Sequence, residues 1–219
     1  KNFEEVLKTL SPDQAFELIG QLLVVLDYLF AHNVLHLDLK PKNILIVSHE
    51  NKLQLKLIDY GLAALFFKPT RQESETVGTP PYASPEFAIR HYLDVRSDLY
   101  SVGVLLYLAL CKRLPFEGKD AVEVLQAQLK QDPSPLKPLP SGVPQKISEL
   151  ISKLLARDPQ SRWESPRAVL RALTEILGKS PVPWPPLFSD PDEVFFYEEQ
   201  LRLFRKIILQ GGRWAIQGP

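Results

Sequence analysis

The chain has 219 residues, of which 45% are hydrophobic, so it can bury a sizeable core and we expect a globular protein. Its 26 basic and 26 acidic side chains balance, which excludes the overall positive field that draws a protein onto nucleic acid. Recognition of any partner must therefore depend on local groups.

A single cysteine, Cys111, excludes an internal disulfide. No apolar run approaches the roughly 20 residues that cross a bilayer, and no basic and apolar leader opens the chain. These features predict a soluble protein without a membrane span, in a reducing compartment such as the cytoplasm. The chain has no methionine and therefore no initiator, which indicates a piece of a longer protein.

The first predicted element is a helix that begins near Ser11. Ser11 can cap it, Pro12 suits its first turn, and Gln14 can complete a capping box. Apolar residues then recur at helical spacing and predict one broad buried face. They are Phe16, Ile19, Leu22, Leu23, Leu26 and Phe30.

A hairpin follows, because two short apolar runs, Ile44 to Val47 and Leu53 to Ile58, flank a polar turn. The stretch from residue 59 to Glu86 has few periodic signals and is predicted to be a long loop, which in a compact domain is usually functional.

Helical patterns resume after the loop, and Gly178 is placed to end the last one. The predicted helices are Ser97 to Cys111, Lys119 to Lys130, Gln145 to Ala156 and Pro166 to Leu177. A proline-dense run then marks a boundary. We therefore divide the chain into a main unit, 1–178, a linker, 179–190, and the start of a following domain, 191–219.

Four polar residues are expected to meet at one edge of the hairpin: Asp38, Lys40, Asn43 and Asp59. The first three precede the first strand and the fourth follows the second, so two acids, one cation and one amide gather there. Phosphoryl transfer needs a proton acceptor, a positive charge near the moving group and oxygen ligands for magnesium. This set of residues is suited to that reaction.

These residues also stand in motifs that resemble the protein kinase family. HLDLKPKN is similar to the catalytic loop of kinases, IDYGLA to their metal-binding motif and GTPPYASPE to the end of their activation segment. SDLYSVGVLLY, RLPF and DPQSRW follow in the family's order, and the resemblance covers about residues 1–178. It implies a mainly α fold with a small β-hairpin, the large C-terminal lobe of a kinase. No glycine-rich loop or strand lysine precedes Lys1, so we expect the small lobe to be absent.

The resemblance implies a role for each residue of the polar set. Asp38 corresponds to the catalytic base and Lys40 to the contact with the transferring phosphate, whereas Asn43 and Asp59 would hold Mg²⁺ on the phosphates of ATP. Thr79, with the Lys-Pro pair after Asp38, is similar to serine/threonine kinases. The expected substrate is therefore a serine or threonine hydroxyl of a protein.

Further family positions support these residues. His36 would pack beneath the catalytic loop, Gly61 belongs to the metal-binding motif, and Asp98 would accept hydrogen bonds from backbone amides of the catalytic loop. Glu86 and Arg162 correspond to a buried ion pair, which would cost about 3–5 kcal/mol to break. The alternative is an exposed pair worth less than about 1 kcal/mol.

Simpler interpretations exist for single residues. Asp38 and Asp59, taken alone, are typical turn or capping residues. His32 and His36 stand four apart but flank a turn, so we interpret them as structural rather than as metal ligands. Cys111 ends a helix and is expected to be a small buried hydrophobe rather than a nucleophile.

Two departures from the family pattern affect function. Leu37 stands where the family often has an arginine that binds a phosphate on the activation loop, so we expect activity that does not depend on loop phosphorylation. Without the small lobe the nucleotide site is incomplete. The chain is then either a piece of an active kinase or a catalytically inactive docking module. We favour the first, because an inactive module has no need to keep the polar set together.

The last 29 residues, 191–219, carry an apolar helical stripe and then Arg213 to Ile216, which has strand character, before Gly218-Pro219. A strand that runs into Gly-Pro is similar to the opening of the phosphate-binding loop in AAA-like signalling ATPases. The alternative is a terminal helix packed on the kinase lobe.

Overall fold

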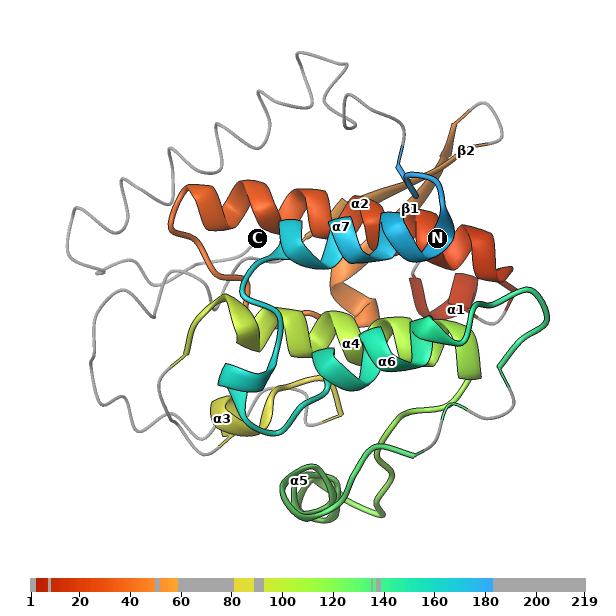
Figure 1. Cartoon of the computed structure of the whole chain (residues 1–219). Coiled ribbons are helices and arrows are strands. Elements are labelled where there is room, and N and C mark those ends of the chain that lie inside the picture. The colour runs from red at the N-terminus through yellow and green to blue at the C-terminus, as the bar shows by residue number, and fades with distance from the viewer. Residues whose placement is uncertain are drawn as a thin grey trace, which may run out of the picture.

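The computed structural model describes residues 3–7, 9–49, 52–58, 81–88, 93–134, 136 and 139–182, and the structural statements below concern these residues. The fold is mostly helical with one two-stranded sheet, as expected (Figure 1). The elements are α1 Phe3–Leu7, α2 Pro12–Ala31, a 3-10 turn Pro41–Asn43, β1 Ile44–His49, β2 Lys52–Leu57, α3 Pro85–Ala88, α4 Val95–Cys111, α5 Ala121–Lys130, α6 Lys146–Leu154, a 3-10 turn Pro159–Ser161 and α7 Pro166–Leu177.

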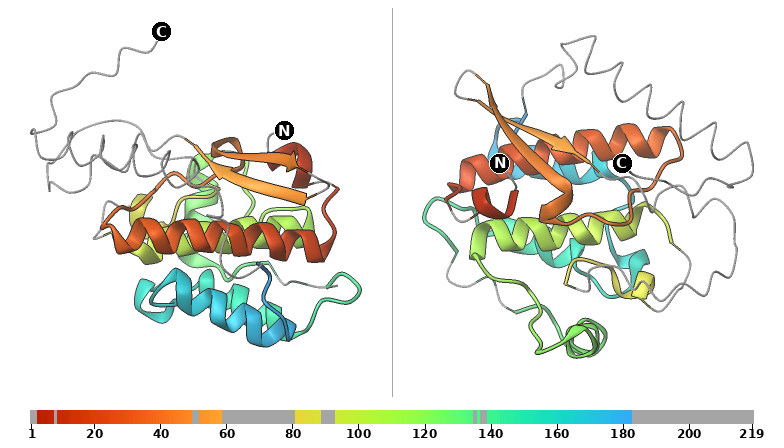
Figure 2. Two further views of the ribbon diagram at one scale, coloured as in Figure 1. Left: turned by 90° about the horizontal axis from the view of Figure 1, so that it is seen from above. Right: turned by 180° about the vertical axis from the view of Figure 1, so that it is seen from behind.

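Helix α2 lies at the centre of the fold, and its predicted start is confirmed. Ser11 caps it, and the Ser11 amide donates to Oε1 of Gln14 over 3.0 Å, which completes the capping box. Figure 2 shows α2 between the hairpin on one side and α7 on the other, and α2 also contacts α4. The helix is therefore buried on several sides rather than on one stripe.

The length of α2 corrects the expectation that no apolar segment approaches the length of a membrane span. By length and composition α2 could cross a bilayer, and it is the one such helix in the described part of the chain. In the fold, 67% of that stretch is buried. A helix that is apolar nearly all round is also what a core position requires, so its composition fits its place among the hairpin, α4 and α7.

The predicted hairpin is confirmed, with β1 and β2 antiparallel and Ile44 opposite Leu57. Alternation places Ile44 and Ile46 in the core, whereas Leu45 and Val47 point outward and are 37% and 40% exposed. The amide of Ile58 donates to the Asn43 carbonyl over 2.9 Å, so the pairing of the two strands extends to Asn43 at the open end of the hairpin.

Helix α4 begins at Val95, two residues before the predicted start, and Asp94 caps it: the Asp94 carboxylate accepts from the Arg96 amide over 2.8 Å. The helix packs closely on α6 at Gly103. A Cβ there would lie 2.7 Å from Cβ of Leu154, so only glycine fits.

The predicted helices after α4 are confirmed, with α7 at the predicted bounds and α5 and α6 one or two residues shorter at one or both ends. Gly178 ends α7 in the left-handed conformation, with φ of 68°. Helices α1 and α3 were not predicted, because one turn is too short to show a period.

The proposed linker starts against the main unit. Val182 is buried, and Pro181 and Val182 lie so near α2 that a Cβ at Gly20 would be 3.0 Å from each. Residues 183–219 lie outside the described residues. The boundaries at 178 and 190, and the identity of the following domain, stay predictions.

Candidate active site

The loop between α2 and the hairpin brings together three residues of the predicted polar set. Nζ of Lys40 donates to Oδ2 of Asp38 over 2.6 Å. Nδ2 of Asn43 donates to the same Oδ2 and to the main-chain carbonyl of Asp38, both over 2.9 Å. Lys40 and Asn43 thus hold the Asp38 carboxylate from two sides.

A turn and a strand together fix Asn43 in this loop. Pro41 opens the 3-10 turn that ends at Asn43, and β1 begins at the next residue, so Asn43 is fixed by both the turn and the strand. Asn43 is buried, whereas Asp38 and Lys40 are only partly buried. An aspartate and a lysine at this edge can therefore be reached from solvent.

Asp98, on the first turn of α4, holds the loop from below. Its Oδ2 accepts from the His36 amide over 2.8 Å, and its Oδ1 accepts from the Leu37 amide over 2.7 Å. Leu37 has φ of 61°, a left-handed conformation that a branched residue rarely adopts. Such backbone strain persists only where surrounding contacts impose it, and Asp98 supplies two of them.

The carboxyl group of Asp98 is fully buried, and its burial raises the pKa to about 6, although the hydrogen bonds from His36 and Leu37 oppose the rise. The ionised carboxylate accepts these bonds most strongly. The hold on the loop therefore depends on pH in the mildly acidic range.

The two histidines have separate structural surroundings. His36 is fully buried, and its Nδ1 accepts from the Asp38 amide over 3.3 Å. His32 lies within hydrogen-bonding distance of the Tyr28 carbonyl, with Nδ1 at 2.8 Å, and its ring packs on the ring of Tyr28. The described residues contain no cluster of three His, Cys, Asp or Glu side chains that could hold a metal ion.

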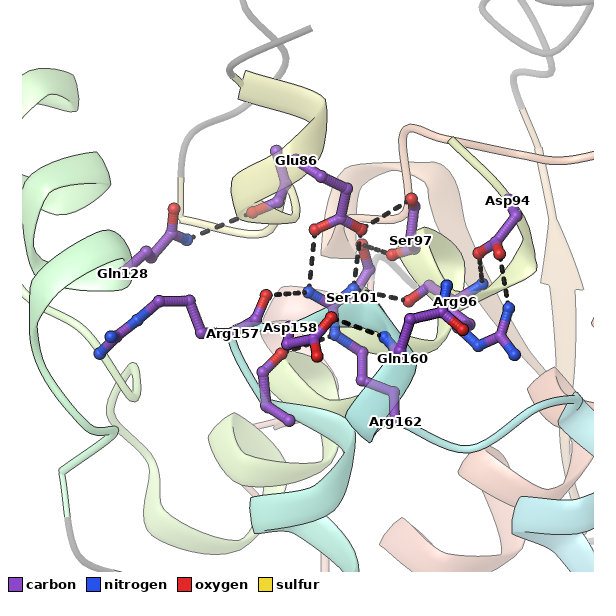
Figure 3. Close-up of polar contacts among 12 residues, drawn as sticks. Glu86, Asp94, Arg96, Ser97, Ser101, Gln128, Arg157, Asp158, Gln160 and Arg162 are labelled. Atoms are coloured by element: carbon purple, nitrogen blue, oxygen red, sulfur yellow. Dashed lines mark hydrogen bonds and ion pairs between the residues drawn. The ribbon is translucent and has the colours of Figure 1, made fainter. Parts of the chain in front are cut away.

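Glu86 and Arg162 form a bidentate ion pair, although 76 residues separate them (Figure 3). The two hydrogen bonds measure 2.7 and 2.8 Å, and the side chains are 6% and 0% exposed, respectively. The alternative of an exposed pair is therefore wrong. Ser97 also donates to Glu86 over 2.8 Å, a contact that sequence reasoning missed because a serine within a helix carries no distinctive signal.

Arg162 also bonds to three main-chain carbonyls, one in the first turn of α4 and two in the loop after α6. Its guanidinium donates to Ala156 over 2.7 Å, to Arg96 over 3.0 Å and to Arg157 over 3.2 Å. Burial alone would raise the pKa of Glu86, but the hydrogen bonds and charge of Arg162 outweigh it and lower that pKa below its usual value. The pair is thus ionised and ties α3 to the start of α4 and the loop after α6.

Three predicted site residues, Asp59, Gly61 and Thr79, lie outside the described residues, so their roles stay predictions. Cys111 is partly buried, and this burial raises the pKa of its thiol, which disfavours the nucleophilic thiolate. Sequence reasoning also missed Gln21, whose only signal was a polar residue inside an apolar helical run.

Comparison with known proteins shows which family the chain resembles. The family profile described as protein kinase domain matches residues 1–173. Serine/threonine-protein kinase PknB of Mycobacterium leprae is 30% identical over 183 residues, which cover 83% of this chain and 29% of that protein. CDPK-related kinase 8 of Arabidopsis thaliana is 34% identical over 160 residues, 73% of this chain and 26% of that protein. The chain thus spans less than a third of the length of these relatives.

Proposed function

The chain belongs to the protein kinase family, and on this premise we propose that, within its complete protein, it transfers the γ-phosphoryl group of ATP to a serine or threonine hydroxyl of a protein. The observation that carries the proposal is the set of short hydrogen bonds that joins Lys40 and Asn43 to Asp38 in one braced loop. The names of the relatives support the choice of serine and threonine.

Asp38 would act as the proton acceptor. Lys40 and Asn43 both bond to Oδ2, so these contacts orient the carboxylate and leave Oδ1 outside them. The substrate hydroxyl would give its proton to Oδ1 as its oxygen attacks phosphorus. The ammonium group of Lys40 would stabilise negative charge on the moving phosphoryl group.

The remaining donors fit magnesium. Asn43 uses Nδ2 for both bonds to Asp38, so its Oδ1 is not committed to that residue, and Mg²⁺ prefers such hard oxygen ligands. Asn43 and Asp59 would hold the ion, and Mg²⁺ would neutralise charge on the phosphates of ATP.

We assign the chain to the large lobe of the kinase. The exposed Leu45 and Val47 on the outer face of β1, directly after Asn43, support this choice, because exposed apolar side chains beside a polar site suit a covering group such as a second lobe or a nucleotide base. The following domain and a cytoplasmic location are proposed from the sequence.

The test uses the complete protein with Mg²⁺ and ATP, and peptides that carry serine, threonine or tyrosine. The wild type should phosphorylate the first two, and Lys40→Met should lower the rate at least about 100-fold. Lys42→Met is the matched control, because Lys42 is exposed two residues further on, and it should keep the wild-type rate. A pure complete protein that transfers no phosphate would favour the docking module instead.

A further inference from the structure

Gln21 is a buried polar residue in the middle of α2 that the proposed transfer does not use. It is 2% exposed, yet its carboxamide makes two short hydrogen bonds. Nε2 donates to the Leu53 carbonyl over 2.8 Å, and Oε1 accepts from the Leu55 amide over 2.7 Å. Both partners belong to β2, so one side chain of the central helix holds the hairpin through directional bonds.

The carboxamide takes the place of a neighbouring strand. Leu53 and Leu55 are two residues apart, so the carbonyl of one and the amide of the other point to the same side of β2. A residue of a parallel strand forms this same pattern with two such positions. Within the described residues β1 is the one strand paired with β2, so Gln21 extends the pairing at the other edge.

The hairpin held in this way leads directly to the candidate active site. Leu55 is three residues from Ile58, about 10 Å along the strand, and Ile58 bonds to Asn43 at the end of the hairpin. The leucines of β2 pack on the core through contacts that have no direction and tolerate sliding. Hydrogen bonds require a set distance and angle, so Gln21 fixes the position of β2 along α2.

We propose that Gln21 is a positioning residue for the Mg²⁺ and ATP site. It fixes the hairpin on α2, and so sets where Asn43, at the start of β1, lies relative to Asp38. The inference rests on the proposed function, because the position of Asn43 matters only if Asn43 holds the metal ion. Gln21 lies outside the reacting groups and acts through the hairpin.

The experiment compares two buried glutamines in the complete protein. Gln21→Met keeps the length of the side chain and removes both hydrogen bonds. Gln128→Met is the matched control, because Gln128 is equally buried but lies on α5, where its Nε2 donates to the Ala83 carbonyl over 3.2 Å. Binding of Mn²⁺ with ATP is measured by electron paramagnetic resonance, and exchange of the hairpin amides is measured by hydrogen–deuterium exchange.

Gln21→Met should weaken the binding of Mn²⁺ with ATP about 10-fold, the usual effect of losing a partner that orients a metal ligand. It should also speed exchange at residues 52–57. Gln21→Glu keeps the acceptor for the Leu55 amide and should fall between Gln21→Met and the wild type. Gln128→Met should match the wild type in both measurements.

Unchanged binding in Gln21→Met, or an equal loss in Gln128→Met, would overturn the positioning role. A wild-type protein that binds Mn²⁺ with ATP but transfers no phosphate would refute the proposed function alone, because the binding measurement would still decide the role of Gln21.

Discussion

Removing Glu86 should destabilise the fold by several kilocalories per mole. The change Glu86→Ala leaves the guanidinium of Arg162, whose side chain is 0% exposed, with three main-chain carbonyls but no counter-charge. Breaking one partner of a buried pair costs about 3–5 kcal/mol. For a domain of this size that loss lowers the melting temperature by roughly 10 °C.

The assay is urea unfolding of the complete protein at neutral pH, followed by tryptophan fluorescence. Asp27→Ala is the matched control, because it removes an ion pair to Arg167 on the surface, where the arginine side chain is 65% exposed. That control should cost less than about 1 kcal/mol. A loss of less than about 1 kcal/mol in Glu86→Ala would refute the claim that this buried pair supports the fold.

Two further measurements separate charge from packing. Arg162→Met should cost more than Glu86→Met, because it also deprives three carbonyls of a donor, and the double variant should lose less than the sum. The pKa of Glu86 is lowered in the fold, so the pair's stabilisation is present above about pH 4.5 and is lost as pH falls through the folded-state pKa. The gap between wild type and Glu86→Gln should therefore shrink in acid.

Four further predictions concern the loop and the helices around it. Asp98→Asn should cost about 2 kcal/mol in thermal unfolding, since an amide cannot accept from both loop amides. The wild-type transfer rate should fall as pH drops through about 6, where the Asp98 carboxyl becomes protonated, and Asp98→Asn should not show this fall. Lys112→Met and Lys112→Gly should both be less stable in urea than wild type, because Nζ of Lys112 bonds three carbonyls. Lys112→Met should be the less stable of the two, because φ is 56° at this position and glycine adopts that conformation without strain. Gly103→Ala should cost about 1–3 kcal/mol by calorimetry, because the new methyl group meets α6. Phosphatase treatment should leave the transfer rate unchanged, because Leu37 is apolar and buried and cannot bind a phosphate.

Much of the fold follows from local sequence rules. The capping box at Ser11, the apolar alternation of the hairpin and Gly178 after α7 each depend on a few neighbouring residues, and each was predicted. The start of α4 was predicted two residues late, at Ser97, because the cap at Asp94 was not recognised in the sequence.

The candidate site was predicted to the extent that it is written in short motifs. Asp38, Lys40 and Asn43 stand within six residues, so a tight turn necessarily brings them close. The buried pairing of Glu86 with Arg162 was available only through the family resemblance, because 76 residues separate the two. Gln21 was beyond reach, since its role depends on where β2 lies along α2.

The most direct test of the central claim is the single-turnover rate of phosphoryl transfer by the complete protein with Asp38→Asn. An amide cannot accept the proton of the substrate hydroxyl, so the rate should fall by about 100-fold to 10,000-fold while ATP affinity stays near that of wild type. Asp27→Asn should keep the full rate. Transfer by Asp38→Asn at the wild-type rate would contradict the assignment of Asp38 as the catalytic base.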